Sequence, residues 1–200
     1  MSVPGDSGQT ADTSQRRAVF LDRDGVLNRA RVVDGKPLPP SSVGELDLLP
    51  GVDDACRELH EAGLLLIVVT NQPDVARGTQ TIAGVEALNR KLSSRLPLDE
   101  IRICPHDDAD RCQCRKPAPG LLLDAARYWG IDLQRSVMVG DRWRDVEAGR
   151  RAGCKTVFID SGYSERSPEA PDYTVRQLGE AVPWILERSA EGRSDHAHSR

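Results

Sequence analysis

The chain has 200 residues, the length of one domain, and 38% of them are hydrophobic, which is enough to form a buried core. Its 27 basic and 31 acidic side chains leave a net charge of −4, and only 4% of the residues are aromatic. This composition argues against a nucleic-acid-binding protein, which needs a basic excess and aromatic platforms for the bases.

Both ends of the sequence are polar. Residues 1–15 lack the apolar run of a secretory signal, and no stretch approaches the roughly 18 consecutive apolar residues of a transmembrane helix. We therefore expect a cytoplasmic protein with no membrane partner. We expect residues 1–15 to be a disordered leader, residues 16–187 the folded domain, and residues 188–200 a disordered tail.

Short apolar runs alternate with helical patterns along the domain. The runs are continuous rather than alternating in polarity, which is typical of strands that are covered on both faces in a parallel sheet. The five expected strands are residues 18–21, 64–69, 101–103, 137–139 and 156–159.

Between these runs, apolar residues spaced three and four apart predict helices. The expected helices are residues 52–62, 82–96, 120–129, 146–152 and 181–187. Gly63, Gly130 and Gly153 directly follow three of them, as glycine often does at a helix end. The alternation predicts an α/β fold with a doubly wound, mainly parallel sheet, whose ligands bind beyond the carboxyl ends of the strands.

The first expected strand runs directly into Asp22, Asp24 and Gly25. Two carboxylates two residues apart can face one cleft, where a cation would offset their repulsion. The alternative is an Asx turn in which Gly25 supplies a positive φ. Both interpretations stay open on these residues alone.

Polar residues also follow the second and fourth expected strands. Thr70 and Asn71 could bind phosphoryl oxygens or cap the strand end. Asp141 comes directly after a buried strand, whereas Asp145 is either part of the same site or only an acid in the first turn of a helix. The cations of Arg115-Lys116 stand between a cysteine cluster and a proline, which leaves them little freedom.

The cysteine cluster contains three thiols and an imidazole within eleven residues: Cys104, His106, Cys112 and Cys114. This is a complete tetrahedral Cys₃His set with no open position, so the zinc it predicts is structural. The alternative is a loop of free thiols. Five cysteines with this spacing fit a metal site better than a disulfide framework.

Four motifs occur in order: DRDGVLN at 22–28, TNQ at 70–72, RKP at 115–117 and GDRWRD at 140–145. Together they resemble the haloacid-dehalogenase-like (HAD) phosphohydrolase superfamily, over residues 18–159. The resemblance implies a Rossmann-like fold and a Mg²⁺-dependent phosphatase that works through an aspartyl-phosphate. It implies roles for these residues: Asp22 as the nucleophile, Asp24 as the general acid and base, Asp22, Asp141 and the backbone carbonyl of Asp24 as Mg²⁺ ligands, and Thr70, Asn71 and Lys116 as phosphoryl ligands.

The cysteine loop at 104–114, leading into RKP, is similar to the capless zinc-loop branch of this superfamily. That branch contains heptose bisphosphate phosphatases and histidinol-phosphate phosphatases. The resemblance implies that no cap domain is present, that zinc is structural, and that Arg115, Lys116 and Arg142 lie at the substrate. We expect a monomer that acts on a small phosphorylated sugar.

The choice within this branch depends on two loops. The segment TNQPDVARG at 70–78 favours the heptose enzymes and the 7-phosphate of D-glycero-D-manno-heptose 1,7-bisphosphate. Residues 29–37 lack the acidic-x-Gly-Tyr segment usual in those enzymes, and the zinc loop is short. A histidinol-phosphate phosphatase therefore stays open as the alternative. A non-catalytic zinc module is disfavoured because Asp22 and Asp24 are both intact.

Overall fold

The computed structural model describes residues 15–33 and 36–190. Its main feature is a six-stranded sheet in the order β5-β4-β1-β6-β7-β8, in which every neighbouring pair is parallel. The strands are β1 Ala18–Leu21, β4 Leu65–Asn71, β5 Glu100–Cys104, β6 Val137–Gly140, β7 Lys155–Ile159 and β8 Tyr173–Val175. The expected doubly wound α/β fold is confirmed.

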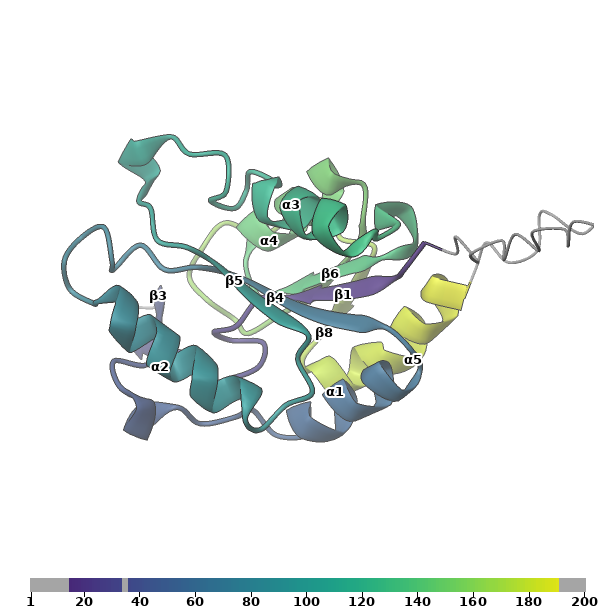
Figure 1. The fold of residues 1–200 in the computed structure, drawn as a ribbon, viewed down its shortest axis with the longest axis horizontal. Helices are drawn as coiled ribbons and strands as arrows, with labels where there is room; N and C mark the ends of the chain where they lie inside the picture. Colours follow the sequence, from purple (N-terminus) through teal and green to yellow (C-terminus); the bar gives the residue numbers. More distant parts are fainter. Residues whose placement is uncertain (1–14, 34–35, 191–200) are drawn as a thin grey trace, which may run out of the picture.

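Helices cover both faces of this sheet (Figure 1). One face carries α1 Val52–Glu61, α2 Ile82–Ser93 and α5 Leu178–Ala190, and the other carries α3 Gly120–Trp129 and α4 Trp143–Ala152. No helix of the described residues is long and apolar enough to cross a membrane.

Strand β1 shows why the apolar runs are continuous. Val19 and Leu21 pack into the core beneath α1 and α5, whereas Ala18 and Phe20 pack into the core beneath α3 and α4, and all four are fully buried. Burying a side chain such as Leu or Phe contributes about 1.5–3 kcal/mol, so both faces of the strand stabilise its place at the centre of the sheet.

Several helix boundaries differ from the expected ones. Helix α4 begins three residues earlier than expected, because the Asp145 carboxylate accepts a hydrogen bond from the backbone N–H of Arg142 and caps the first turn. Helix α2 ends at Ser93, and the buried Leu96 packs from the turn that follows it. Helix α5 begins at Leu178, which places Pro183 inside the helix rather than in its first turn.

The expected domain limits need one correction. Helix α5 extends to residue 190, so the tail expected from residue 188 begins with three helical residues. They continue the helix because its inner face still packs: Ser189 is buried and accepts a hydrogen bond from Arg17 at its backbone carbonyl. The leader up to residue 14 and the tail from residue 191 lie outside the described residues.

Some short elements were not expected. Strands β2 Arg31–Val33 and β3 Lys36–Leu38 form an antiparallel hairpin after β1, and β8 pairs with β7 at the edge of the sheet. Short 3₁₀ segments are η1 Val43–Glu45, η2 Asp108–Asp110 and η3 Leu133–Arg135. Between β1 and α1 the described residues form the β2–β3 hairpin and η1.

Candidate active site

The carboxyl ends of β1, β4 and β6 meet at one edge of the sheet, because these strands are parallel neighbours. A cleft of about 350 Å³ opens there. It is lined by every side chain for which a catalytic or substrate-binding role was expected: Asp22, Asp24, Thr70, Asn71, Arg115, Lys116 and Arg142. The fold therefore brings together residues that are up to 120 positions apart in the sequence.

A buried ammonium group lies at the base of the cleft. Lys116 Nζ is 3.0 Å from Asp22 Oδ1 and 2.5 Å from Asp145 Oδ1, and all three side chains are buried. Burial raises the pKa of Asp22 to about 6, although the positive charge of Lys116 opposes that rise. Asp145 therefore combines the two roles considered for it: it caps the first turn of α4, and it belongs to the charged cluster at the base of the cleft.

Asp141 lies beneath the cleft, almost completely buried. Apart from the neighbouring Tyr163 hydroxyl, its carboxylate oxygens have no hydrogen-bond partner among the described residues, and burial together with the charges of Asp22 and Asp145 raises its pKa well above the usual range. One oxygen from each of these three carboxylates lies within 4.8 Å of the others. Buried carboxylate oxygens with so few partners fit a hard divalent cation such as Mg²⁺.

The loop after β1 approaches this cluster closely at Gly25. Its φ is +87°, and a Cβ atom there would lie 1.8 Å from Asp141 Oδ2 and 2.9 Å from the Tyr163 hydroxyl oxygen. A side chain is therefore excluded by both conformation and space. Burial and the charge of Asp141 raise the pKa of Tyr163, so its hydroxyl stays protonated beside the carboxylate.

Asp24 is held by three side chains that the sequence analysis did not single out. Its carboxylate accepts hydrogen bonds from Arg23 at 2.9 and 3.2 Å, from Asn28 at 2.9 Å and from Gln72 at 3.0 Å. The fully buried Arg23 is in turn anchored on Asn89 of α2 at 2.9 Å. Arg23, Asn28 and Gln72 all stand inside the motifs DRDGVLN and TNQ, so membership of a motif was the sequence feature that could have identified them.

The two polar residues at the end of β4 play different structural parts. Asn71 donates to the backbone carbonyl of Lys116 at 3.0 Å and accepts from its backbone N–H at 3.1 Å. Its amide therefore fixes the segment that carries the buried lysine. Thr70 faces the cleft, and its hydroxyl oxygen accepts a hydrogen bond from Gln72 at 2.9 Å.

Four guanidinium groups line the cleft, each held by an acid, and one of them is Arg77, which contacts Asp107 at 2.7 Å. Arg115 contacts Asp108 at 2.8 Å, and Arg144 contacts the same carboxylate at 3.2 and 3.3 Å. Arg142 contacts Glu165 at 2.9 Å in a two-bonded pair. The arginine Arg144 and the acid Glu165 were not among the expected site residues, because neither belongs to a motif position with an implied role.

The cysteine cluster closes on itself beside this rim. The donor atoms of Cys104, His106, Cys112 and Cys114 lie 3.2–3.6 Å apart in five contacts. A tetrahedral zinc with bonds of about 2.3 Å holds sulfur atoms about 3.8 Å apart, so this donor set fits the ion with little adjustment. Arg115 donates to the carbonyl of His106 at 3.2 Å, which ties the cluster to the cleft.

Comparisons with known proteins agree with this geometry. Residues 113–181 match the HAD-hydrolase-like family model. The D-glycero-D-manno-heptose-1,7-bisphosphate 7-phosphatase of Thermosynechococcus vestitus is 36% identical over 193 residues, which cover 85% of this chain and 95% of the relative. The D-glycero-beta-D-manno-heptose-1,7-bisphosphate 7-phosphatase of Escherichia coli K12 is 37% identical, covering 87% of this chain and 90% of the relative.

A solved structure is similar over the same region. The D,D-heptose 1,7-bisphosphate phosphatase of B. bronchiseptica, complexed with magnesium and phosphate, superposes with a TM-score of 0.70 at 31% identity. The match covers 86% of this chain and 98% of that one.

Proposed function

Because the chain belongs to the heptose-1,7-bisphosphate 7-phosphatase family of HAD-like phosphohydrolases, we propose that it removes the 7-phosphate of D-glycero-D-manno-heptose 1,7-bisphosphate. The observation that carries this proposal is the pairing, in one cleft, of a buried carboxylate cluster with a rim of four arginines. The cluster suits the phosphoryl group that reacts, and the rim suits a second phosphate on the same small molecule.

The reaction proceeds in two steps on residues of this chain. An oxygen of Asp22 attacks phosphorus and the bond to the sugar oxygen breaks, while Asp24 gives its proton to that leaving oxygen. Asp24 then takes a proton from water as the water attacks phosphorus, and phosphate leaves Asp22. The three side chains that hold Asp24 keep its carboxylate at a fixed position for both transfers.

Lys116 and the residues of β4 stabilise the negative charge of this step. The Lys116 ammonium contacts Asp22 at 3.0 Å, where it reduces the repulsion between the attacking carboxylate and an anionic phosphate. Thr70 offers its hydroxyl to a phosphoryl oxygen. Asn71 supports this lysine, because its side-chain amide forms hydrogen bonds with both the backbone carbonyl and the backbone N–H of Lys116.

The buried Asp141 carboxylate, whose oxygens have no described partner besides the Tyr163 hydroxyl, supports Mg²⁺ as the cofactor, held by Asp22, Asp141 and the backbone carbonyl of Asp24. When bound, the ion supplies positive charge that lets an anionic nucleophile approach an anionic phosphate. Asp145 stands within reach of the same cluster, but its 2.5 Å contact with Lys116 assigns it to the lysine.

Zinc on Cys104, His106, Cys112 and Cys114 is proposed as a structural ion. The four donors close the coordination shell, so the ion orders the loop and the attached Arg115 rather than taking part in the chemistry. Thiolate zinc ligands suit a reducing compartment, which supports the cytoplasmic location expected from the sequence.

A comparison of substrates tests the proposal. Heptose 1,7-bisphosphate is expected to have the highest kcat/KM when measured beside histidinol phosphate and a nucleoside monophosphate. Histidinol phosphate carries a single phosphate and leaves the arginine rim without an anion, so we expect it to react at least roughly tenfold more slowly. A preference for histidinol phosphate would move the protein to the alternative specificity, since both reactions use the same carboxylates.

A further inference from the structure

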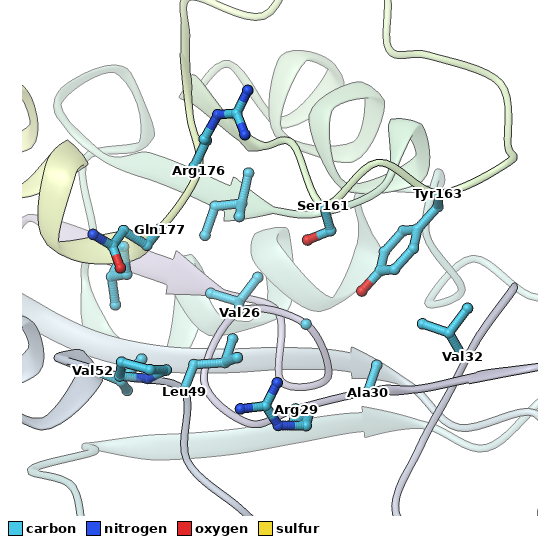
Figure 2. Close-up of a pocket in the computed structure, with 14 residues that line it drawn as sticks. Val26, Arg29, Ala30, Val32, Leu49, Val52, Ser161, Tyr163, Arg176 and Gln177 are labelled. Atoms are coloured by element: carbon cyan, nitrogen blue, oxygen red, sulfur yellow. The ribbon is translucent and has the colours of Figure 1, made fainter. Parts of the chain in front are cut away.

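A second cavity of about 350 Å³ lies on the other side of the loop that follows β1 (Figure 2). None of the residues that line it also lines the catalytic cleft. Its walls come from that loop, from the segment before α1, from the end of β7 and from the start of α5. We call it the Arg176 pocket.

The floor of the Arg176 pocket is aliphatic. Val26, Val52, Ile159 and Leu178 are buried core residues that present their side chains to the cavity, and Leu49 completes the surface. Such a floor excludes water from an apolar ligand and gives no partner to the hydroxyl groups of a sugar. The pocket therefore differs in chemistry from the cleft, whose walls are mainly charged.

The rim of the Arg176 pocket is cationic. Figure 2 places Arg29 and Arg176 on opposite sides of the cavity, and no acidic side chain is among the residues that line it. The guanidinium group of Arg176 has no ion pair or hydrogen bond with any described residue. Arg29 contacts Asp47 at 3.3 Å, but both side chains are more than 60% exposed, so that pair contributes little and can be replaced.

Hydroxyl and amide groups complete the lining. Ser161, Tyr163 and Gln177 stand at the wall, and the Tyr163 hydroxyl lies beside Gly25, where it is hydrogen-bonded to Asp141. Helices α1 and α5 also begin at this cavity, and the Glu180 carboxylate accepts a hydrogen bond from the backbone N–H of Arg176 at 3.0 Å at the start of α5. The acids of those turns, Asp53, Asp54 and Glu180, are not among the lining residues.

We propose that the Arg176 pocket is a second binding site, which takes a small organic anion with an apolar body. The phosphate or carboxylate group of the ligand binds Arg176 and Arg29, and its apolar part rests on the aliphatic floor. The polyol substrate proposed for the cleft does not match this floor, so the ligand is a different molecule. A separate, convergent set of charged, polar and apolar groups in one cavity is the usual composition of a ligand site.

Calorimetric titration of the Mg²⁺-loaded and zinc-loaded protein tests this site. The probe is phenylphosphonate, which carries a phosphonate anion on an apolar ring and has no ester bond to hydrolyse. Inorganic phosphate supplies the anion without the ring, and benzyl alcohol supplies the ring without the anion. We expect saturable binding of phenylphosphonate and much weaker binding of both simpler probes, because each of them loses one half of the contacts.

Matched variants locate the binding. Arg176→Ala is expected to weaken phenylphosphonate binding roughly tenfold, whereas Arg115→Ala, the same change at the rim of the cleft, leaves it unchanged. Ser161→Glu places a carboxylate at an exposed position of the cavity wall and is expected to abolish binding. Arg176 and Ser161 are exposed, whereas the Arg115 side chain is largely covered, so a cooperative thermal unfolding transition is recorded to verify that each variant is folded.

Three results would overturn the proposal. The first is the absence of saturable phenylphosphonate binding in the millimolar range. The second is binding that Arg115→Ala weakens and Arg176→Ala does not, which places the probe in the catalytic cleft. The third is inorganic phosphate binding as tightly as phenylphosphonate, which shows that the aliphatic floor contributes nothing.

Discussion

At the scale of single residues, Lys116 connects the catalytic cluster to the stability of the fold. Its ammonium group is buried and forms ion pairs with Asp22 and Asp145. Its positive charge offsets the negative charges of these two carboxylates. A buried ion pair is costly to break, because removing one partner leaves the other charge buried alone. The lysine is therefore needed for two reasons, one catalytic and one structural.

Replacing Lys116 by Met tests both reasons. Lys116→Met is expected to abolish turnover and to lower the free energy of unfolding by about 3–5 kcal/mol in the absence of Mg²⁺. Adding Mg²⁺ should restore part of that loss, since the cation replaces the missing charge. The control is Lys155→Met, which breaks an exposed pair with Asp172 and should cost less than about 1 kcal/mol. Equal losses in the two variants would contradict this account.

The raised pKa of Asp22 makes Mg²⁺ binding depend on pH. Burial raises this pKa from 3.8 to about 6 in the protein without a cation, so Asp22 is protonated below that pH and ionised above it. Only ionised carboxylates bind the cation, and the pKa of the neighbouring ligand Asp141 is raised as well, so the affinity for Mg²⁺ should fall as pH drops toward and below about 6. Near pH 6, calorimetry in buffers of different ionisation enthalpy should detect proton release on binding. Release of no proton would show that Asp22 is already ionised in the free protein.

The raised pKa of Asp22 affects the stability of the cation-free protein in the opposite direction, so that stability falls where Mg²⁺ affinity rises. A carboxyl whose folded-state pKa is raised binds protons more tightly when folded than when unfolded. Asp22 therefore contributes stability below pH 3.8, and that contribution is lost as pH rises through about 6. Catalysis and cation binding need the ionised form of Asp22, whereas burial in the cation-free protein favours the protonated form. Such a conflict is typical of a residue retained for function.

At the scale of elements, the loop after β1 depends on a glycine. Gly25→Ala would place a methyl group 1.8 Å from Asp141 Oδ2, so the carboxylate must move and Mg²⁺ affinity should fall at least roughly tenfold. The matched control is Gly63→Ala at the end of α1, which also has a positive φ but no atom within 4 Å of the new Cβ. That variant should lose about 1 kcal/mol of stability and keep its Mg²⁺ affinity. Titration calorimetry and thermal unfolding separate the two effects.

The elements differ in how far the sequence predicts them. Strands β1, β4, β6 and β7 were predicted because burial on both faces demands continuous apolar runs. Strand β8 and the β2–β3 hairpin were missed because each strand has three residues, and one of them contains Pro37. The first turn of α4 was missed because its capping contact, and not apolar spacing, fixes its start.

The site shows the same division. Asp22, Lys116 and Asp141 were predicted because motif order and strand ends both indicate them, and the structure places them together. The support of Asp24 by Arg23 and Gln72 was not predicted: both residues stand inside the motifs, but the sequence alone does not show which side chain they contact. Pairing of the rim arginines with acids depends on loop geometry in the same way.

The loop between β5 and α3 has little regular secondary structure to fix its conformation. It carries one short 3₁₀ segment, η2, and three of the four expected zinc ligands, the fourth being Cys104 at the end of β5. The end of the loop positions Arg115 and Lys116. Cys112→Ser is expected to lose zinc, to lower the melting temperature and to raise KM more than it lowers kcat, because the arginine loses its support. The control is Cys56→Ser, a buried cysteine of α1, which should keep one zinc per chain. Elemental analysis measures the zinc content of the two variants, and steady-state kinetics measures their kcat and KM. Full activity in zinc-free protein would falsify the structural role of the ion.

At the scale of the whole molecule, a single sheet edge organises both cavities. The catalytic cleft and the Arg176 pocket lie on the two sides of the loop after β1, and Gly25 and Tyr163 stand where the pocket meets the buried carboxylates. This follows from the strand order: β1 is central, with β4 on one side of it and β6 followed by β7 on the other. The parallel arrangement therefore brings polar loops from both sides of β1 to the same edge.

The exposed apolar surface bears on the expected oligomeric state. The large exposed apolar residues of the described part come from five different elements: Val32, Val43, Ile82, Tyr128 and Tyr173. A stable dimer interface needs a contiguous patch, so we expect a monomer. Sedimentation equilibrium should give a mass near 21.9 kDa, and the activity per chain should stay constant on dilution. A doubled mass, with activity that falls as the protein is diluted, would show that a second copy completes the site.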